Sequence, residues 1–190
     1  IASCLVGSEM CIRDRIGTAF AVLALNFPDE RGLTPASTAI SFARDIPWLD
    51  LAFAGPAIGV ILFVIWSNLI TTATTNAVNL TDGLDGLATG ATAMITGAYV
   101  LISLFQSSQS CALEGTRGCY EVRDPMDLAL LAAILTGSLL GFLWWNTSPA
   151  KIFMGDTGSL GLGGALAGFA IFTRTEILVA VLAGLMVAIT

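Results

Sequence analysis

The sequence contains no histidine, and only 12% of its 190 residues are charged. A soluble domain averages about a quarter charged residues, so half that fraction argues against a soluble fold. The absence of histidine disfavours a zinc or copper site, for which imidazole is the usual ligand. The eight lysines and arginines form no basic patch, which excludes a nucleic-acid-binding surface.

Apolar residues dominate instead, at 55% of the chain with a mean hydropathy of +0.83. Four long windows carry no charged residue: 51–81, 86–113, 128–150 and 157–173. Because a bilayer-spanning helix needs about 20 mostly apolar residues, these windows predict an all-α, polytopic transmembrane helical bundle. We expect about four full spans plus partial helices at both ends, at 16–27 and 177–190. A soluble bundle would need polar stripes, and residues 129–145 (ALLAAILTGSLLGFLWW) are apolar almost all round.

The expected spans are separated by polar segments. Helices are predicted over residues 53–75, 86–105, 125–145 and 157–172. Residues 76–85 and 146–156 are expected to form polar turns. Residues 28–50 contain three prolines and mixed charges, which indicates an extramembrane hairpin or an amphipathic segment.

Three carboxylates lie in the two predicted turns. Between Asp82 and Asp156 the chain crosses the membrane twice, so both turns must emerge on one face. Asp82, Asp85 and Asp156 could therefore meet across neighbouring helix ends. Such hard oxygen ligands suit Mg²⁺ or Mn²⁺.

The second turn runs into a glycine-rich stretch, KIFMGDTGSLGLGG, at residues 151–164. Gly155 and Gly158 flank Asp156 at the predicted start of a helix, where unpaired N–H groups attract phosphate. An acidic metal ligand beside such a helix start suits a nucleotide-diphosphate substrate. Asp82 and Asp156 could also be simple helix caps. Lys151 could be an interfacial anchor or a phosphate partner, and Phe153 could pack on lipid or stack on a base.

Two stretches resemble known signatures. NAVNLTDGLDGLATG (residues 76–90) and FMGDTGSLGLGG (153–164) are similar to those of the phospho-N-acetylmuramoyl-pentapeptide-transferase family. That family lies in the polyprenyl-phosphate N-acetylhexosamine-1-phosphate transferase superfamily, and the resemblance covers residues 16–190. It implies Mg²⁺-dependent transfer of phospho-MurNAc-pentapeptide from UDP-MurNAc-pentapeptide to undecaprenyl phosphate, giving lipid I and UMP for peptidoglycan synthesis. It also implies a multi-pass plasma-membrane protein with a cytoplasmic active site, and it leaves homodimerisation open.

The resemblance also assigns roles to individual residues. Asp156 would be a catalytic residue and a metal ligand, and Asp82 would help to organise the metal and the diphosphate. The other motif positions are candidate substrate contacts: Asn79 and Gly155 near the ribose and phosphates, Asp85 and Phe153 at the uracil, and Lys151 at a phosphate.

The chain departs from the family pattern in two respects. It has no adjacent aspartate pair, which the family carries in an earlier DDxxK-type motif, and no late histidine-rich loop. We therefore expect a chain shortened at both ends, inactive alone, with the general base outside it. Residues 1–15 (IASCLVGSEMCIRDR) resemble adaptor sequence, so residues 1–15 are expected to be a non-native leader and 16–190 a partial transferase domain. Cys4 and Cys11 are accordingly left out of the chemistry, and Cys111 and Cys119 are either disulfide-bonded or free thiols.

Two other functions remain open at this point. A sister transferase of the superfamily would move GlcNAc-1-phosphate or a related sugar phosphate to polyprenyl phosphate. A transporter would line an ion path with its acids, but carboxylates clustered at helix ends argue against it. The positive-inside rule weakly favours the opposite orientation, because more basic residues fall on the far face than on the site face.

Overall fold

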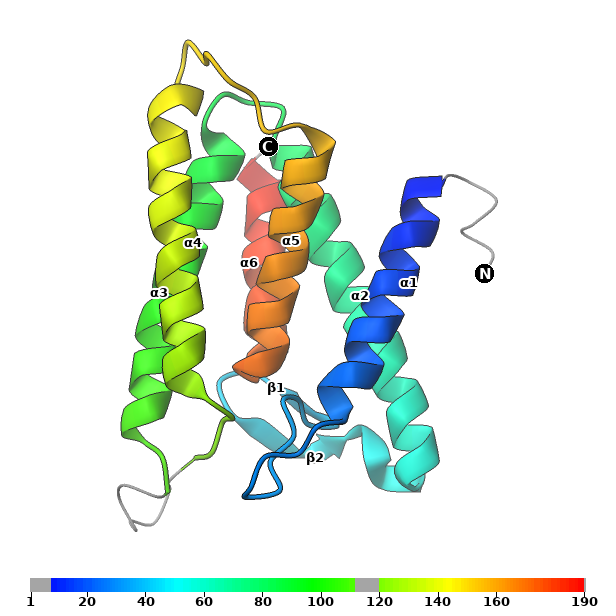
Figure 1. Cartoon of the computed structure of the whole chain (residues 1–190). Coiled ribbons are helices and arrows are strands. Elements are labelled where there is room, and N and C mark those ends of the chain that lie inside the picture. The colour runs from blue at the N-terminus through cyan, green and yellow to red at the C-terminus, as the bar shows by residue number, and fades with distance from the viewer. Residues whose placement is uncertain (1–7, 112–119, 190) are drawn as a thin grey trace.

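The fold is a helical bundle with a small β-hairpin at one end (Figure 1). The computed structural model describes residues 8–111 and 120–189. Within them lie six α-helices: α1 (Ser8–Leu25), α2 (Pro56–Thr81), α3 (Leu87–Ser108), α4 (Pro125–Asn146), α5 (Gly155–Phe172) and α6 (Glu176–Ile189). Strands β1 (Ala39–Ser41) and β2 (Asp45–Asp50) pair antiparallel, and a short 3₁₀ turn, η2 (Leu51–Ala54), leads into α2. The predicted helical class is confirmed, and of the two interpretations of residues 28–50 the structure shows the hairpin.

Three of the described helices, α2, α3 and α4, are long and apolar enough to cross a membrane. Apolar side chains point outward along α4, including Leu130, Leu131 and Ile134, each more than half exposed. Such a surface is costly in water and suits a lipid environment. The chain is therefore a multi-pass membrane protein.

Of the about four full spans expected, three are α2, α3 and α4. The fourth candidate, α5, has 18 residues, but it begins with a polar turn around Asp156 and is rich in glycine. Those residues lower its apolar character below that of its neighbours. Helix α5 packs closely against α2, so its small residues serve helix contact.

Two helix pairs make the closest contacts in the bundle, α3 with α4 and α2 with α5. The first pair is joined by the Thr136 hydroxyl, which donates to Thr96 Oγ1 at 2.8 Å. The bundle interior also contains a stacked aromatic pair, Tyr99 and Phe169, with ring centroids 5.6 Å apart. Small side chains let membrane helices approach closely, and hydroxyl groups form hydrogen bonds between them.

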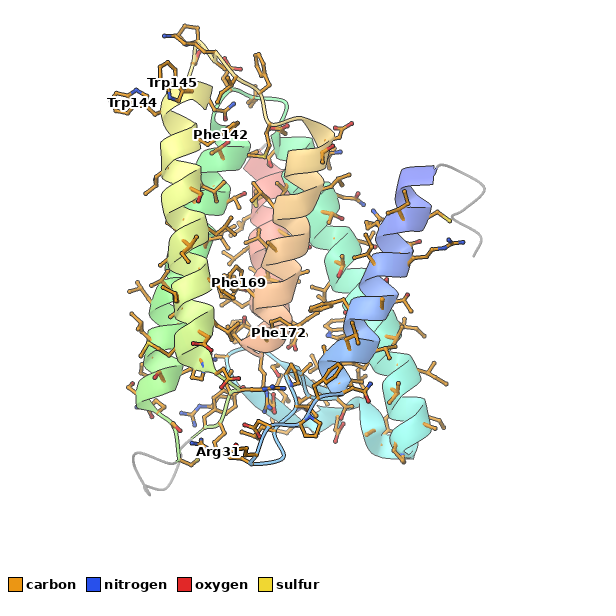
Figure 2. The ribbon with its side chains drawn as sticks, in the orientation of Figure 1. Arg31, Phe142, Trp144, Trp145, Phe169 and Phe172 are labelled. Atoms are coloured by element: carbon orange, nitrogen blue, oxygen red, sulfur yellow. The ribbon has the colours of Figure 1, made fainter. Side chains whose placement is uncertain are left out.

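The two ends of the bundle differ in chemistry. Figure 2 shows Trp144 and Trp145 where α4 meets the α4–α5 loop, and Arg31 at the opposite end, where the β-hairpin lies. At that hairpin end, Arg174 forms an ion pair with Asp45 at 2.7 Å. The buried Glu176 carboxylate accepts a hydrogen bond from the Ser41 backbone N–H at 3.0 Å. These contacts attach the hairpin to the link between α5 and α6.

Several predicted boundaries are wrong. Helix α2 continues to Thr81, beyond the predicted end at residue 75. The Thr75 and Thr81 hydroxyls donate to carbonyls four residues earlier in the same helix. Helix α2 starts at Pro56, after Gly55 with a φ of 111°, and not at residue 53. Helix α5 begins at Gly155, before the predicted residue 157.

The chain before residue 16 is also partly helical. Helix α1 begins at Ser8, so its first two turns come from the segment interpreted as a leader. Cys111 is disulfide-bonded, and its suggested partner Cys119 lies outside the described residues.

Candidate active site

The two polar turns lie side by side at one end of the bundle (Figure 1). The Ala150 backbone N–H donates to Asp85 Oδ2 at 3.2 Å, which joins the α4–α5 loop to the α2–α3 turn. This arrangement confirms the prediction that both turns emerge on one face. Helix α2 ends where the Asp82 N–H donates to the Val78 and Asn79 carbonyls.

Asp82 and Asp156 form the acidic centre of this face. Partial burial raises the pKa of Asp82 above its ordinary value, and the nearby charge of Asp156 raises it further. A hydrogen bond from the Gly155 backbone N–H acts in the opposite direction. A bound cation could relieve the repulsion between these two carboxylates.

Asp85 does not join that pair, because its carboxylate is directed to the Ala150 amide. Across residues 8–111 and 120–189 no three acidic, cysteine or histidine side chains are grouped closely enough to hold a metal ion. The site is therefore a carboxylate pair with a third acid at its rim.

Asn79 is held in place from the neighbouring helix. The Ser159 hydroxyl of α5 donates to Asn79 Oδ1 at 2.9 Å and also contacts the Asp156 carbonyl oxygen at 3.2 Å. Asn79 therefore lies in the last turn of α2, facing α5, and not in a loop. No described residue accepts a hydrogen bond from its side-chain amide nitrogen, so a ligand could do so.

The start of α5 is shaped for an anion. Gly155 has a φ of 68°, in the left-handed region that favours glycine. Its N–H and those that follow begin the helix, where the macrodipole is positive. No side chain or backbone atom stands within 4 Å of the position where a Cβ would be at Gly155, so a ligand could approach the backbone there.

The loop between α4 and α5 is anchored by one buried amide. Asn146 Oδ1 accepts from the Thr89 hydroxyl at 2.7 Å, and its Nδ2 donates to the Ile152 carbonyl at 2.9 Å. The Lys151 ammonium lies 5.1 Å from the centre of the Trp145 ring, a cation–π contact. Phe153 is 72% exposed at the rim, so its ring is open to a partner.

A groove of about 580 Å³ runs from Asp156 along the bundle, between α1, α2 and α5. Its walls are mostly apolar, with Ile16, Phe20 and Leu160 among them. Arg13 of α1 lines the end near Asp156 and donates to Asn76 Oδ1 at 3.3 Å. The groove joins the acidic pair to a long apolar surface.

Sequence reasoning overlooked three contributors to this geometry: Asn146, Ser159 as the partner of Asn79, and Arg13. A polar residue that closes a long apolar run, as Asn146 does, is the signal that could have identified the first. Ser159 is recognisable only once α2 and α5 are known to be neighbours. Arg13 was set aside with the segment interpreted as a leader.

Comparison with known proteins relates these motifs to one family. The sequence model of glycosyl transferase family 4 matches residues 31–174. A relative from Renibacterium salmoninarum, named phospho-N-acetylmuramoyl-pentapeptide-transferase, is 67% identical over 187 residues, covering 96% of this chain and 50% of its own. A relative with the same name from Pseudarthrobacter chlorophenolicus is 65% identical over 185 residues, covering 96% of this chain and 50% of its own. Another from Streptomyces avermitilis is 60% identical over 179 residues, covering 92% of this chain and 48% of its own. The chain thus spans about half the length of the curated relatives it matches.

Proposed function

Because the chain belongs to glycosyl transferase family 4, we propose that the whole protein is a phospho-N-acetylmuramoyl-pentapeptide-transferase. It transfers phospho-MurNAc-pentapeptide from UDP-MurNAc-pentapeptide to undecaprenyl phosphate, releasing UMP and forming lipid I. The observation that carries the proposal is the position of Asp156, which lines the apolar groove and lies near Asp82, whose carboxylate accepts from the Gly155 amide. A diphosphate donor and a lipid acceptor need those two surfaces to adjoin.

The carboxylate pair fits Mg²⁺. Mg²⁺ commonly takes one or two carboxylates from a protein, and substrate phosphates and water complete its coordination. Asp82 and Asp156 would supply those two carboxylates, and the raised pKa of Asp82 reflects burial and repulsion that a cation relieves. When bound, Mg²⁺ neutralises negative charge on the diphosphate.

The protein's own groups position the donor. The N–H groups at the start of α5 would face the phosphates, and Asn79, whose side chain accepts from Ser159, would donate from its amide nitrogen. Phosphoryl transfer depends mostly on such positioning and charge stabilisation. Phe153 would stack on the uracil ring and Asp85 would accept from its edge.

The acceptor would lie in the groove between α1, α2 and α5. Its apolar walls suit a polyprenyl chain. Lys151 remains a candidate phosphate contact, although its ammonium lies over Trp145. The donor is a nucleotide made in the cytoplasm, so we place this face on the cytoplasmic side of the plasma membrane.

The test is an assay of the whole protein, expressed at the length of its relatives, in isolated membranes. UMP release is followed with undecaprenyl phosphate and either UDP-MurNAc-pentapeptide or UDP-GlcNAc, with Mg²⁺ and with EDTA. Release with the first donor only, abolished by EDTA, is the expected result. Release with UDP-GlcNAc only would assign the protein to a sister transferase, and no release with either donor would refute the proposal. The 190-residue chain is assayed in parallel, and we expect it to be inactive.

A further inference from the structure

A groove of about 680 Å³ lies at the end of the bundle opposite the acidic pair, where the β-hairpin meets α3 and the start of α6 (Figure 1). Its lining is mostly apolar. Phe42 and Trp48 line the hairpin side and are 48% and 84% exposed. Leu101 and Phe105 line the α3 side and are 69% and 61% exposed. Large apolar side chains on both sides are therefore open to the surroundings of the bundle.

The α3 side of the groove belongs to a membrane-spanning helix. Helix α3 is one of the three described helices that are long and apolar enough to cross a membrane. At a rise of about 1.5 Å per residue, Leu101 lies about 10 Å before the helix ends at Ser108. The groove shared by Leu101 and Trp48 therefore extends from the hairpin along the final part of the span. Since the outer side of a spanning helix contacts acyl chains, the groove opens towards lipid.

A further aromatic ring continues this surface at the start of another span. Phe53 of η2 is 81% exposed, and α2 begins three residues later at Pro56. At the opposite end of the bundle, Trp144 is 80% exposed near the end of α4, whose 22 residues rise about 33 Å. Aromatic rings at the two ends are thus separated by about the thickness of a hydrocarbon core, as in the aromatic belts of membrane proteins.

The carboxylates of the hairpin are engaged within the protein. Asp45 pairs with Arg174 at 2.7 Å, and Asp50 accepts from the Ala52 N–H at 2.9 Å. The Arg44 guanidinium lies over an aromatic ring of the groove. Aromatic and aliphatic side chains therefore dominate the contact between this groove and its surroundings, and they offer a headgroup no specific partner.

We propose that the hairpin is an interfacial anchor, with Trp48 and Phe53 at the boundary between headgroups and acyl chains. One acyl chain of a lipid in that leaflet lies in the groove between Trp48 and Leu101. Interfacial segments bury their apolar face about 5–10 Å into this boundary, which agrees with the depth of Leu101 along α3. Lipid is favoured over a protein partner, because the groove is continuous with the exposed side of a spanning helix.

This anchoring does not depend on the proposed transferase activity, because the groove and the acidic pair lie at opposite ends of the bundle (Figure 1). It also gives the hairpin a definite place. The Ser41 backbone N–H donates to Glu176 at the start of α6, so a hairpin held at the bilayer surface also holds the link between α5 and α6.

The test is quenching of tryptophan fluorescence in the 190-residue chain, reconstituted in phosphatidylcholine vesicles. The lipid is brominated in either the upper or the lower part of one acyl chain. Trp66, Trp144 and Trp145 are replaced by phenylalanine, so that Trp48 is the single tryptophan. We expect most of its emission to be lost with the upper bromines, less with the lower ones, and little with iodide added to the water. A protein that keeps only Trp144 is the matched control for an interfacial ring.

Quenching by iodide with none by brominated lipid would place the hairpin in water and overturn the proposal. Protection from both quenchers would mean that a second copy of the chain covers the ring, and stronger quenching by the lower bromines would place it too deep for an interfacial anchor. Either result would also overturn the proposal. Circular dichroism verifies folding. If the triple replacement loses helix, the Trp48→Phe chain is compared with the parent, and the same quenching must then appear in the difference between the two spectra.

Discussion

Substitution of Gly163 by alanine should separate α2 from α5 and thereby disturb the acidic site. A Cβ at Gly163 would lie 2.4 Å from Thr75 Cα, 2.7 Å from Thr75 N and 2.8 Å from the Thr74 carbonyl oxygen. All three atoms belong to the backbone of α2, so no side-chain rotation can relieve the contact. The two helices must move apart.

The size of the effect follows from that geometry. Ordinary Cβ contacts begin at 3.4 Å, so the helices must separate by about 1 Å at this point. Overpacking of this kind costs about 1–3 kcal/mol, and alanine in a helix interior returns about 0.5–1 kcal/mol relative to glycine. We therefore expect a net loss of up to about 2.5 kcal/mol in the free energy of unfolding. The shift also reaches the Asn79–Ser159 hydrogen bond, and a misplacement of about 1 Å costs roughly 100-fold in rate.

The assay compares Gly163→Ala with Gly168→Ala, a control at a later glycine of the same helix, α5. A Cβ at Gly168 meets no atom within 4 Å, so the control gains helix propensity without a clash. Unfolding of the 190-residue chain by SDS is followed by circular dichroism, and UMP release is measured for the whole protein. Equal stability of the two variants would refute the helix-contact reasoning. A destabilised Gly163→Ala with unchanged turnover would refute its connection to the site.

Three further predictions concern single residues. Asp156→Asn in the whole protein should lower Mg²⁺-dependent UMP release by about 100- to 1000-fold, because it removes a charged contact to the transition state. Circular dichroism should show no loss of helix. Turnover near the parent level would exclude the metal role. Glu176 has a pKa raised from 4.5 to about 8 by burial, so its folded state holds a proton that the unfolded chain releases, and stability should fall as pH rises from about 4.5 to about 8. SDS unfolding at a series of pH values should show that decline, Glu176→Gln should flatten it, and an equal slope in both proteins would contradict the assignment. Asn146→Ala should lower the free energy of unfolding by about 1–3 kcal/mol, because the Thr89 hydroxyl and the Ile152 carbonyl lose their buried partner. It should also raise the KM for the nucleotide donor more than Asn146→Asp does, because aspartate keeps the acceptor for Thr89. An unchanged KM would mean that the loop does not contact the donor.

The helices were predictable because long apolar runs leave the backbone no other way to satisfy its hydrogen bonds in a bilayer. Their ends were less predictable. Asn76 and Asn79 look like turn residues in the sequence, yet α2 continues through them because Asn79 finds Ser159 across the helix contact. The first turns of α1 were missed because the segment before residue 16 shows no apolar stripe, although Arg13 lies in the groove next to Asp156.

The sequence by itself determined that the chain spans a membrane several times and that the turns holding Asp82, Asp85 and Asp156 share one face. The hydropathy of the chain sets how many times it crosses the membrane. An even number of crossings between two turns places them on the same side, however the helices pack. Only the tertiary structure decided that Asp82 lies near enough to Asp156 to feel its charge, while Asp85 accepts from the Ala150 amide. Helix rotation and the distance between axes determine which side chains meet, and both depend on contacts such as that of Gly163 with α2, between residues far apart in the chain.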